Sequence, residues 1–275
     1  MKDWEVLYWI KANEIQNLPY SSYWTDEKEE ENKPFYILDG NFSKIEQHLE
    51  DYGLLKDLKK CLMILKKEFG QSLEGVGMDL AAGSLWAAPL ILKNEKVEKL
   101  YCLEYSSHRL LKIGPKLLDY YNAPKDKIVL VLGDFYNLRL PNSSLDFLIL
   151  VQAFHHADYP EKLLDEMNRV LKPNGIVIIT GEPAVYLWKG YVKHAAKYFL
   201  SKIIAKKLHS KFLSNTGNIR NFIAKRKELY PPEPILGDHY YSYNEYQSFF
   251  KKYHFDVWHF KDWGSPHRSF ILKKQ

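Results

Sequence analysis

An acidic residue and a run of very small residues lie together near position 80. Residues 76–89 read VGMDLAAGSLWAAP, so that Asp79 closes an apolar run and residues 81–84 carry almost no side chain. Such a turn lets the backbone come close to a ligand, and the helix that follows can offer its N-terminal N–H groups. We therefore predict that Asp79, Ala81 and Gly83 face a bound small molecule.

A second acid closes the next apolar run. Glu104 ends the segment LYCLE, and a carboxylate at the end of a strand can accept hydrogen bonds from both ribose hydroxyls of a nucleoside. Enzymes that bind NAD use the same interaction. The sequence therefore predicts that Glu104 binds a nucleoside, but it does not identify which one.

Two adjacent histidines follow the fourth apolar run. Because an imidazole has a pKa of about 6.5, His155 or His156 can take the proton of an attacking hydroxyl at neutral pH. The sequence shows no nearby cysteine and no third ligand at the spacing of a metal centre, so it predicts no metal site. The pair is a candidate general base.

The segments between these residues predict the elements that hold them. Short apolar runs alternate with amphipathic segments, and the runs are GVGMDL, VEKLYCLE, KIVLVLG, LDFLILV and GIVIITGEP. Strands that are apolar on both faces and alternate with helices predict a doubly wound α/β fold with a mostly parallel sheet. An NAD-binding loop needs its glycines after the strand. Gly75 and Gly77 come before Asp79, which makes an NAD-dependent oxidoreductase the less favoured alternative.

The stretch MDLAAGS resembles the first motif of the class I S-adenosylmethionine-dependent methyltransferases, an acid and an apolar residue followed by glycines and small residues. Asp79, Leu80 and Gly83 match the motif, whereas Ala81 and Leu85 stand where the family usually has glycine. Alanine still permits close approach of a ligand unless the backbone φ angle must be positive. The resemblance implies S-adenosylmethionine as the cofactor and a seven-stranded sheet whose C-terminal strands form an antiparallel pair.

Further stretches resemble the same family in the same order, over roughly residues 75–182. In LGDFYNL, Asp134 resembles the acid that accepts the adenine amino group, with Phe135 against the ring. The stretch FHHADYPEKLLDEMNRVLKPNG resembles the segment from the fourth to the fifth strand. Because the second histidine of such a pair is often structural, His155 is favoured over His156 as the base.

The remaining segments are predicted to surround this core. Residues 1–72 are expected to form a helical N-terminal cap, 73–183 the cofactor-binding core, 184–238 a helical lysine-rich lid, and 239–275 a C-terminal helix and strand pair. An acceptor molecule is expected between the core and the lid. The candidate acceptor contacts are Glu182, Arg220, His239, Tyr240 and Tyr241.

Composition limits the partners of the chain. Its 275 residues carry a net charge of +5, and 34 acidic residues are mixed with the basic ones, unlike a strongly basic nucleic-acid-binding protein. QAFHH stands where methyltransferases of nucleic-acid amines carry an Asn/Asp-Pro-Pro-aromatic stretch. Neither a secretory signal nor a transmembrane segment is recognisable, which predicts a cytoplasmic protein with buried thiols at Cys61 and Cys102. Peripheral membrane contact through the lysine-rich lid remains an alternative.

The predicted function is O-methylation of a small polar or anionic metabolite, for example one that is phosphorylated or linked to a sugar or a nucleotide. The lysines of the lid and Arg220 suggest the anionic character, because arginine can bind a phosphate through two hydrogen bonds. The main alternative is a binding protein that keeps the fold without catalysis. The sequence does not predict the oligomeric state.

Overall fold

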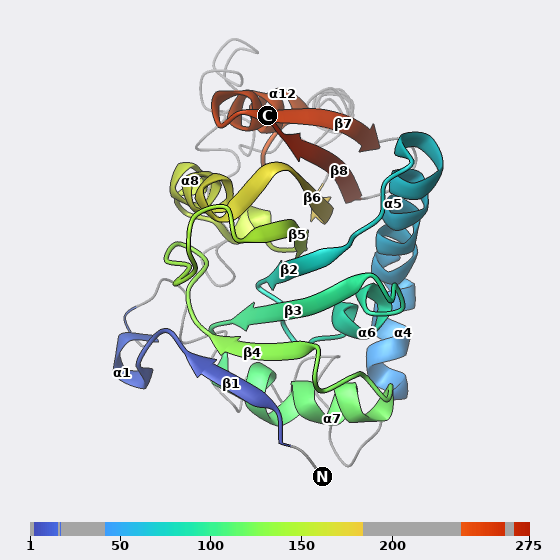
Figure 1. Ribbon diagram of the computed structural model, residues 1–275, viewed down its shortest axis with the longest axis vertical. Helices are drawn as coiled ribbons and strands as arrows, with labels where there is room; N and C mark the ends of the chain where they lie inside the picture. Colours follow the sequence, from blue (N-terminus) through green and yellow to red (C-terminus); the bar gives the residue numbers. More distant parts are fainter. Residues whose placement is uncertain (1–2, 16, 18–41, 184–237, 262–266) are drawn as a thin grey trace, which may run out of the picture.

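A central sheet organises the chain, whose computed structural model describes residues 3–15, 17, 42–183, 238–261 and 267–275. Within these residues the order of the strands across the sheet is β1-β4-β3-β2-β5-β6-β8-β7 (Figure 1). Strands β1 to β6 pair in parallel, and β8 runs antiparallel to both β6 and β7. The strands are β1 (Glu5–Tyr8), β2 (Gly75–Leu80), β3 (Val97–Glu104), β4 (Ile128–Leu132), β5 (Leu145–Val151), β6 (Leu171–Pro183), β7 (Phe255–Lys261) and β8 (His267–Lys274). The predicted doubly wound sheet with a C-terminal antiparallel pair is confirmed.

The described sheet has eight strands, one more than predicted. The additional strand is β1, which lies in the segment predicted as a helical cap and pairs in parallel with β4. Val6 and Leu7 pack into apolar layers on opposite faces of the sheet, which is the period of two that a strand requires. The edge of β4 offers backbone hydrogen bonds to this segment, and they outweigh the helical spacing of its apolar residues.

Helices cover both faces of the sheet. In Figure 1, α4 and α5 lie together along one flank, while α8 and α12 lie on the other side. The helices are α1 (Ala12–Ile15), α4 (Ser43–Asp51), α5 (Leu54–Phe69), α6 (Ala87–Ile91), α7 (Gly114–Tyr120), α8 (Pro160–Val170) and α12 (Tyr243–Lys252), with a π-helical turn η1 (Arg109–Ile113) and a 3-10 turn η2 (Phe154–His156). Ser242 caps α12 through a capping box with Glu245.

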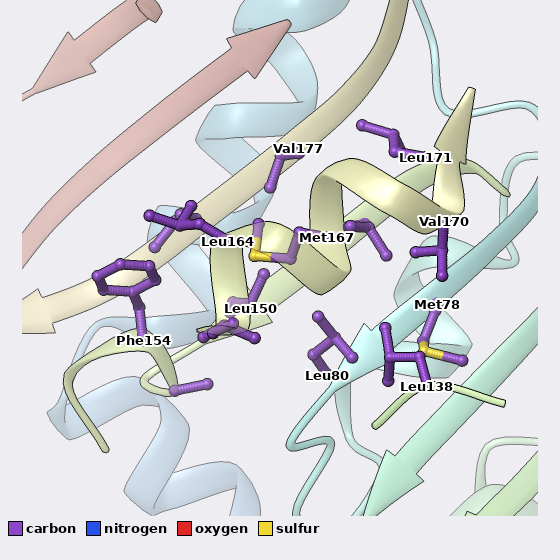
Figure 2. Packing of buried hydrophobic residues seen from close by; sticks show 14 of the residues in the cluster. Met78, Leu80, Leu138, Leu150, Phe154, Leu164, Met167, Val170, Leu171 and Val177 are labelled. Atoms are coloured by element: carbon purple, nitrogen blue, oxygen red, sulfur yellow. The ribbon is translucent and has the colours of Figure 1, made fainter. Parts of the chain in front are cut away.

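Alternate strand residues enter two apolar layers. On one face, Met78 and Leu80 of β2 and Leu150 of β5 pack against Met167 of α8 (Figure 2). The opposite layer contains Ile149 of β5 together with residues of α5 and α6. Cys61 and Cys102 are buried in this second layer as thiols, as predicted. The two layers fix the register of the strands, because a slip of one residue would exchange the faces.

The predicted lid lies outside the described residues, except for Asp238 at its end. Arg220 belongs to that segment, and the predicted domain boundaries remain predictions. None of the helices in the described ranges is long and apolar enough to cross a bilayer.

Candidate cofactor and acceptor site

A cavity of about 380 Å³ opens at the carboxyl ends of the central parallel strands. The chain leaves β2 for β3 on one side, while β5 pairs with β2 on the other side. The cavity therefore lies where the strand order reverses, which is where doubly wound sheets bind ligands. All the residues predicted to bind the cofactor line it, namely Asp79, Ala81, Gly83, Glu104, Asp134 and Phe135.

The turn after β2 has the backbone conformation of a glycine-rich loop, although only one of its three residues with a positive φ angle is glycine. The φ angle is 56° at Ala81, 56° at Gly83 and 67° at Leu85. Glycine adopts this left-handed region without a steric penalty, whereas another residue bears a strain of about 1–2 kcal/mol. Leu85 is fully buried in the apolar layer that contains α6. Its burial offsets the strain, so the loop keeps its shape although alanine and leucine replace two glycines.

Glu104 connects the end of β3 to this loop. Its Oε2 atom accepts a hydrogen bond from the N–H of Gly83 at 2.9 Å, and its Oε1 atom accepts from the N–H groups of Tyr105 and Ser106 at 3.0 and 2.9 Å. Burial raises the pKa of Glu104, although nearby Arg109 and the three N–H groups act in the opposite direction. The two oxygens together offer about four acceptor sites. Glu104 thus holds the loop and retains capacity for one ligand hydroxyl.

Asp79 is buried in the wall with an unsatisfied oxygen. The residue is 2% exposed, and its Oδ2 atom accepts no hydrogen bond from the described residues. Burial, and next the charge of Glu104, raise its pKa to about 8. A buried acceptor without a donor is costly. A cationic or hydrogen-bond-donating group of a ligand would remove this cost.

Asp134 and Phe135 form a neighbouring part of the wall. The Oδ1 atom of Asp134 accepts a hydrogen bond from the N–H of Tyr136 at 3.0 Å, and burial raises the pKa of this carboxyl. The ring of Phe135 meets that of Tyr136 edge to face, with centroids 4.7 Å apart. An acid and an aromatic ring therefore lie together in the cavity wall, and their contact with an adenine stays a prediction.

A cluster of His155, His156 and Asp238 lines another part of the cavity. The Nδ1 atom of His156 lies 3.1 Å from Oδ1 of Asp238, and the Nε2 atom of His155 lies 3.9 Å from the same oxygen. Burial and the adjacent His155 lower the pKa of His156. Burial alone would lower the pKa of His155, but the carboxylate of Glu182 raises it overall. The cluster brings two imidazoles and a carboxylate to one point.

His155 is the more enclosed histidine of the pair and belongs to a hydrogen-bonded network, while the catalytic role of either ring stays a prediction. Its side chain is 6% exposed, compared with 24% for His156, and its Nδ1 atom lies 3.1 Å from Oε2 of Glu182. Its backbone carbonyl accepts a hydrogen bond from the N–H of His239. His156 is therefore the more accessible of the two rings.

Glu182 acts behind the cavity wall instead of at its surface. It is fully buried and accepts hydrogen bonds from the N–H groups of Ala153, Phe154 and His155 and from the hydroxyl of Tyr246. It is not among the described residues that line the cavity. The prediction of a direct acceptor contact at Glu182 is therefore corrected: the residue fixes η2 and the ring of His155.

None of the other predicted acceptor contacts is among the described residues that line the cavity. His239 pairs its Nε2 atom with Asp158 at 2.8 Å, and Tyr241 packs its ring on Phe154 and Phe249. Neither these two residues nor Tyr240 is among the described lining residues, and Arg220 is outside the described ranges. His239 and Tyr241 support the wall from behind.

Several lining residues were not predicted from the sequence. Asp158 and Asp238 carry no motif of their own, and one face of α4 closes the cavity with Ile45, His48 and Leu49. The only sequence signal for α4 is its amphipathic spacing, which predicts a helix without placing it. These residues reach the cavity through the tertiary fold.

Comparisons with known proteins agree with this geometry. Residues 78–179 match the family model described as a methyltransferase domain. An uncharacterised chloroplastic methyltransferase of Arabidopsis thaliana is 27% identical over 129 residues, which are 46% of this chain and 35% of that protein. A demethylmenaquinone methyltransferase of Staphylococcus haemolyticus is 32% identical over 107 residues, which are 36% of this chain and 42% of that protein. This chain thus spans less than half the length of either relative.

The fold recurs among solved structures. A SAM dependent methyltransferase from Aquifex aeolicus superposes with a TM-score of 0.53 at 17% identity, covering 87% of this chain and all of the other. At this identity the likeness concerns the fold alone.

Proposed function

Because residues 78–179 of this chain form a methyltransferase domain that belongs to the class I S-adenosylmethionine-dependent family, we propose that the whole chain binds S-adenosylmethionine and methylates the hydroxyl of a small polar molecule. The observation that carries the proposal is Asp79, a buried carboxyl with an unsatisfied oxygen in a cavity that also contains every predicted cofactor residue. Such a carboxyl suits a ligand that brings a cation.

The residues of the wall match the parts of this cofactor. Asp79 would hold the ammonium group, which also relieves the cost of its own burial. Glu104 would accept a ribose hydroxyl with its remaining acceptor capacity, and Asp134 with Phe135 would hold the adenine. The bound cofactor supplies a methyl group on a sulfonium, a leaving group that needs no further activation.

The task of the chain is then to orient the acceptor and to exclude water. Alignment of two reactants can contribute roughly 7 kcal/mol or more to lowering the barrier. We place the acceptor hydroxyl beside His155 and His156, where an imidazole can receive its proton as the oxygen attacks. His156 is the better placed of the two, because its ring is the more accessible.

The acceptor class is the finer part of the proposal. Asp158 and Asp238 on the described wall suit an acceptor that donates hydrogen bonds, such as a polyhydroxylated metabolite. An anionic group of the acceptor would be held by Arg220 and the lysines of the 184–238 segment. Replacing Arg220 by Glu should then raise the KM for a phosphorylated acceptor and leave the affinity for S-adenosylmethionine unchanged. An unchanged KM would remove the anionic part of the proposal.

Calorimetric titration tests cofactor binding directly. We expect micromolar affinity for S-adenosylmethionine and for its demethylated product, and no binding of NAD. Glu104→Gln should weaken both interactions at least tenfold, because a hydrogen bond to a charged group contributes about 1.5–3 kcal/mol. Glu98→Gln is the matched control, since Glu98 is exposed on the same strand.

Failure of both sulfur ligands to bind would refute the proposal, and binding of NAD would favour the oxidoreductase alternative. A chain that binds S-adenosylmethionine but gives no methylated product with hydroxylated acceptors would instead be a binding protein on the methyltransferase fold.

A further inference from the structure

Three potential metal ligands converge at the acceptor end of the cavity. One donor atom from each of His155, His156 and Asp238 lies within 4.8 Å of the other two. Ligands of one zinc-like ion, bound at about 2.0–2.2 Å, are separated by roughly 3 to 4 Å. The separations of 3.1 and 3.9 Å from Asp238 Oδ1 to the two imidazoles fall in this range. Small side-chain adjustments would complete the set.

The surroundings of His155 are those of a metal-binding imidazole. Its Nδ1 atom faces Oε2 of the fully buried Glu182, which also fixes the backbone of η2. With the Nδ1 proton directed to this carboxylate, the lone pair is on Nε2, the atom that faces Asp238. Metal-binding histidines commonly donate their other ring N–H to a carboxylate, which sets the tautomer and orients the ring.

We propose that His155, His156 and Asp238 bind a divalent transition-metal ion at the acceptor end of the cavity. Two imidazoles and one carboxylate suit Zn²⁺ or Co²⁺ better than Mg²⁺ or Ca²⁺, which prefer oxygen ligands. Three protein ligands leave a position for a further ligand, as in catalytic zinc sites. All three residues line the cavity, so that position faces the space assigned to the acceptor.

The role of the ion rests on the proposed methyl transfer. The acceptor hydroxyl would bind as the next ligand and release its proton to solvent, because a bound cation lowers the pKa of a coordinated oxygen. The C–O bond forms as the C–S bond of the sulfonium breaks, and the electron pair of that bond remains on sulfur as a neutral thioether. In the metal-bound chain the two histidines and Asp238 would serve as ligands, and the ion would take over the role assigned above to the imidazole of His156.

Metal binding can be measured without any turnover. The full chain is stripped with a chelator and titrated with Zn²⁺ in competition with a chromophoric chelator, and separately with Co²⁺ while the visible absorption is recorded. We expect one equivalent bound tightly, with Co²⁺ bands typical of four or five ligands. His156→Ala and Asp238→Asn should each weaken this binding at least tenfold. The matched controls are His254→Asn and Asp165→Asn, since both residues are exposed and absent from the cavity wall.

Titration with S-adenosylmethionine shows whether each variant is folded and separates the two proposals. Lost metal binding with retained cofactor binding supports the metal site. Absence of tight metal binding in the unmodified chain, with normal cofactor binding, overturns the site and leaves the methyltransferase proposal intact. Equal binding by the cluster variants and the controls also overturns it, because the ion would then be held elsewhere. A metal-bound chain that fails to bind S-adenosylmethionine would refute only the proposed function.

Discussion

Two residues other than glycine line the cavity and adopt the left-handed backbone conformation. Ala81 and Gln152 both line it and have φ angles of 56° and 51°. Such conformations persist where surrounding structure holds them, and they gather at ligand sites. At Ala81 the hydrogen bond from Gly83 to Glu104 holds the loop two residues away. The contacts of the chain itself therefore hold this conformation.

Replacing Ala81 by Gly should relieve this strain. We expect the free energy of unfolding to rise by about 1 kcal/mol, since glycine bears no penalty at a positive φ angle. Cofactor affinity should be unchanged or higher, because the loop already has this shape. Urea denaturation and calorimetry with S-adenosylmethionine measure the two quantities. A less stable Ala81→Gly variant would show that the alanine methyl group contributes more through packing than it costs in strain.

Asp79 makes the stability of the ligand-free chain depend on pH. Its pKa is about 8 in the folded chain and about 3.9 when unfolded, so the folded state holds the proton more tightly. This contribution to stability is complete below about pH 4 and is lost as the pH rises through 8. In Asp79→Asn the group is neutral throughout. The Tm of the variant should therefore rise relative to that of the unmodified chain between about pH 5 and pH 9. If the difference in Tm between the two proteins stayed constant across that range, Asp79 would not be a buried carboxyl with a raised pKa.

At the scale of elements, the packing of strand β2 against its neighbour β5 requires a glycine at position 77. A Cβ atom at Gly77 would lie 2.1 Å from the ring of Phe147, a separation that requires movement of the ring or of the strand. The glycine is thus explained by packing within the sheet and has no part in a phosphate loop.

Gly77→Ala should lower the free energy of unfolding by about 2 kcal/mol or more, because overpacking a rigid core costs about 1–3 kcal/mol. Adding Phe147→Leu should recover part of this loss, since the smaller side chain leaves room for the methyl group. Gly70→Ala is the control: a Cβ atom there meets no neighbour, although the φ angle is positive. A Phe147→Leu change that recovers none of the loss at Gly77→Ala would mean that contact with Phe147 is not its cause.

The sequence predicts those elements whose pattern is local. The buried strands and the Ser242 cap follow from residues close in the chain, and so do the acids at strand ends such as Glu104, because all parallel strands end at one edge. Strand β1 was mispredicted, since its pairing with β4 joins segments far apart in sequence. Asp238 and Glu182 illustrate the same limit within the site. Their positions relative to His155 arise only from tertiary packing.

At the scale of the whole molecule, cofactor binding should stabilise the fold. A ligand that binds only the folded state adds about 2.7 kcal/mol at a concentration 100 times its Kd. We expect S-adenosylmethionine at that concentration to raise the Tm by several degrees and NAD at the same concentration to leave it unchanged. The shift should shrink in Asp134→Ala, because we propose that this carboxyl binds the adenine. An equal shift in that variant would remove Asp134 from the binding site.

The cavity is built from two unequal parts of the chain. Residues 78–179, the segment that matches the methyltransferase domain family, supply Asp79, Glu104 and Asp134 of its wall. Ile45 and Leu49 of α4 and Asp238 also line the cavity and lie outside that segment. Substitutions in these flanking segments should therefore change the shape of the cavity while leaving the lining residues of the core segment unaltered. Relatives that share only the core should accordingly be poor guides to the acceptor of this chain, and engineering of a new specificity should begin at α4.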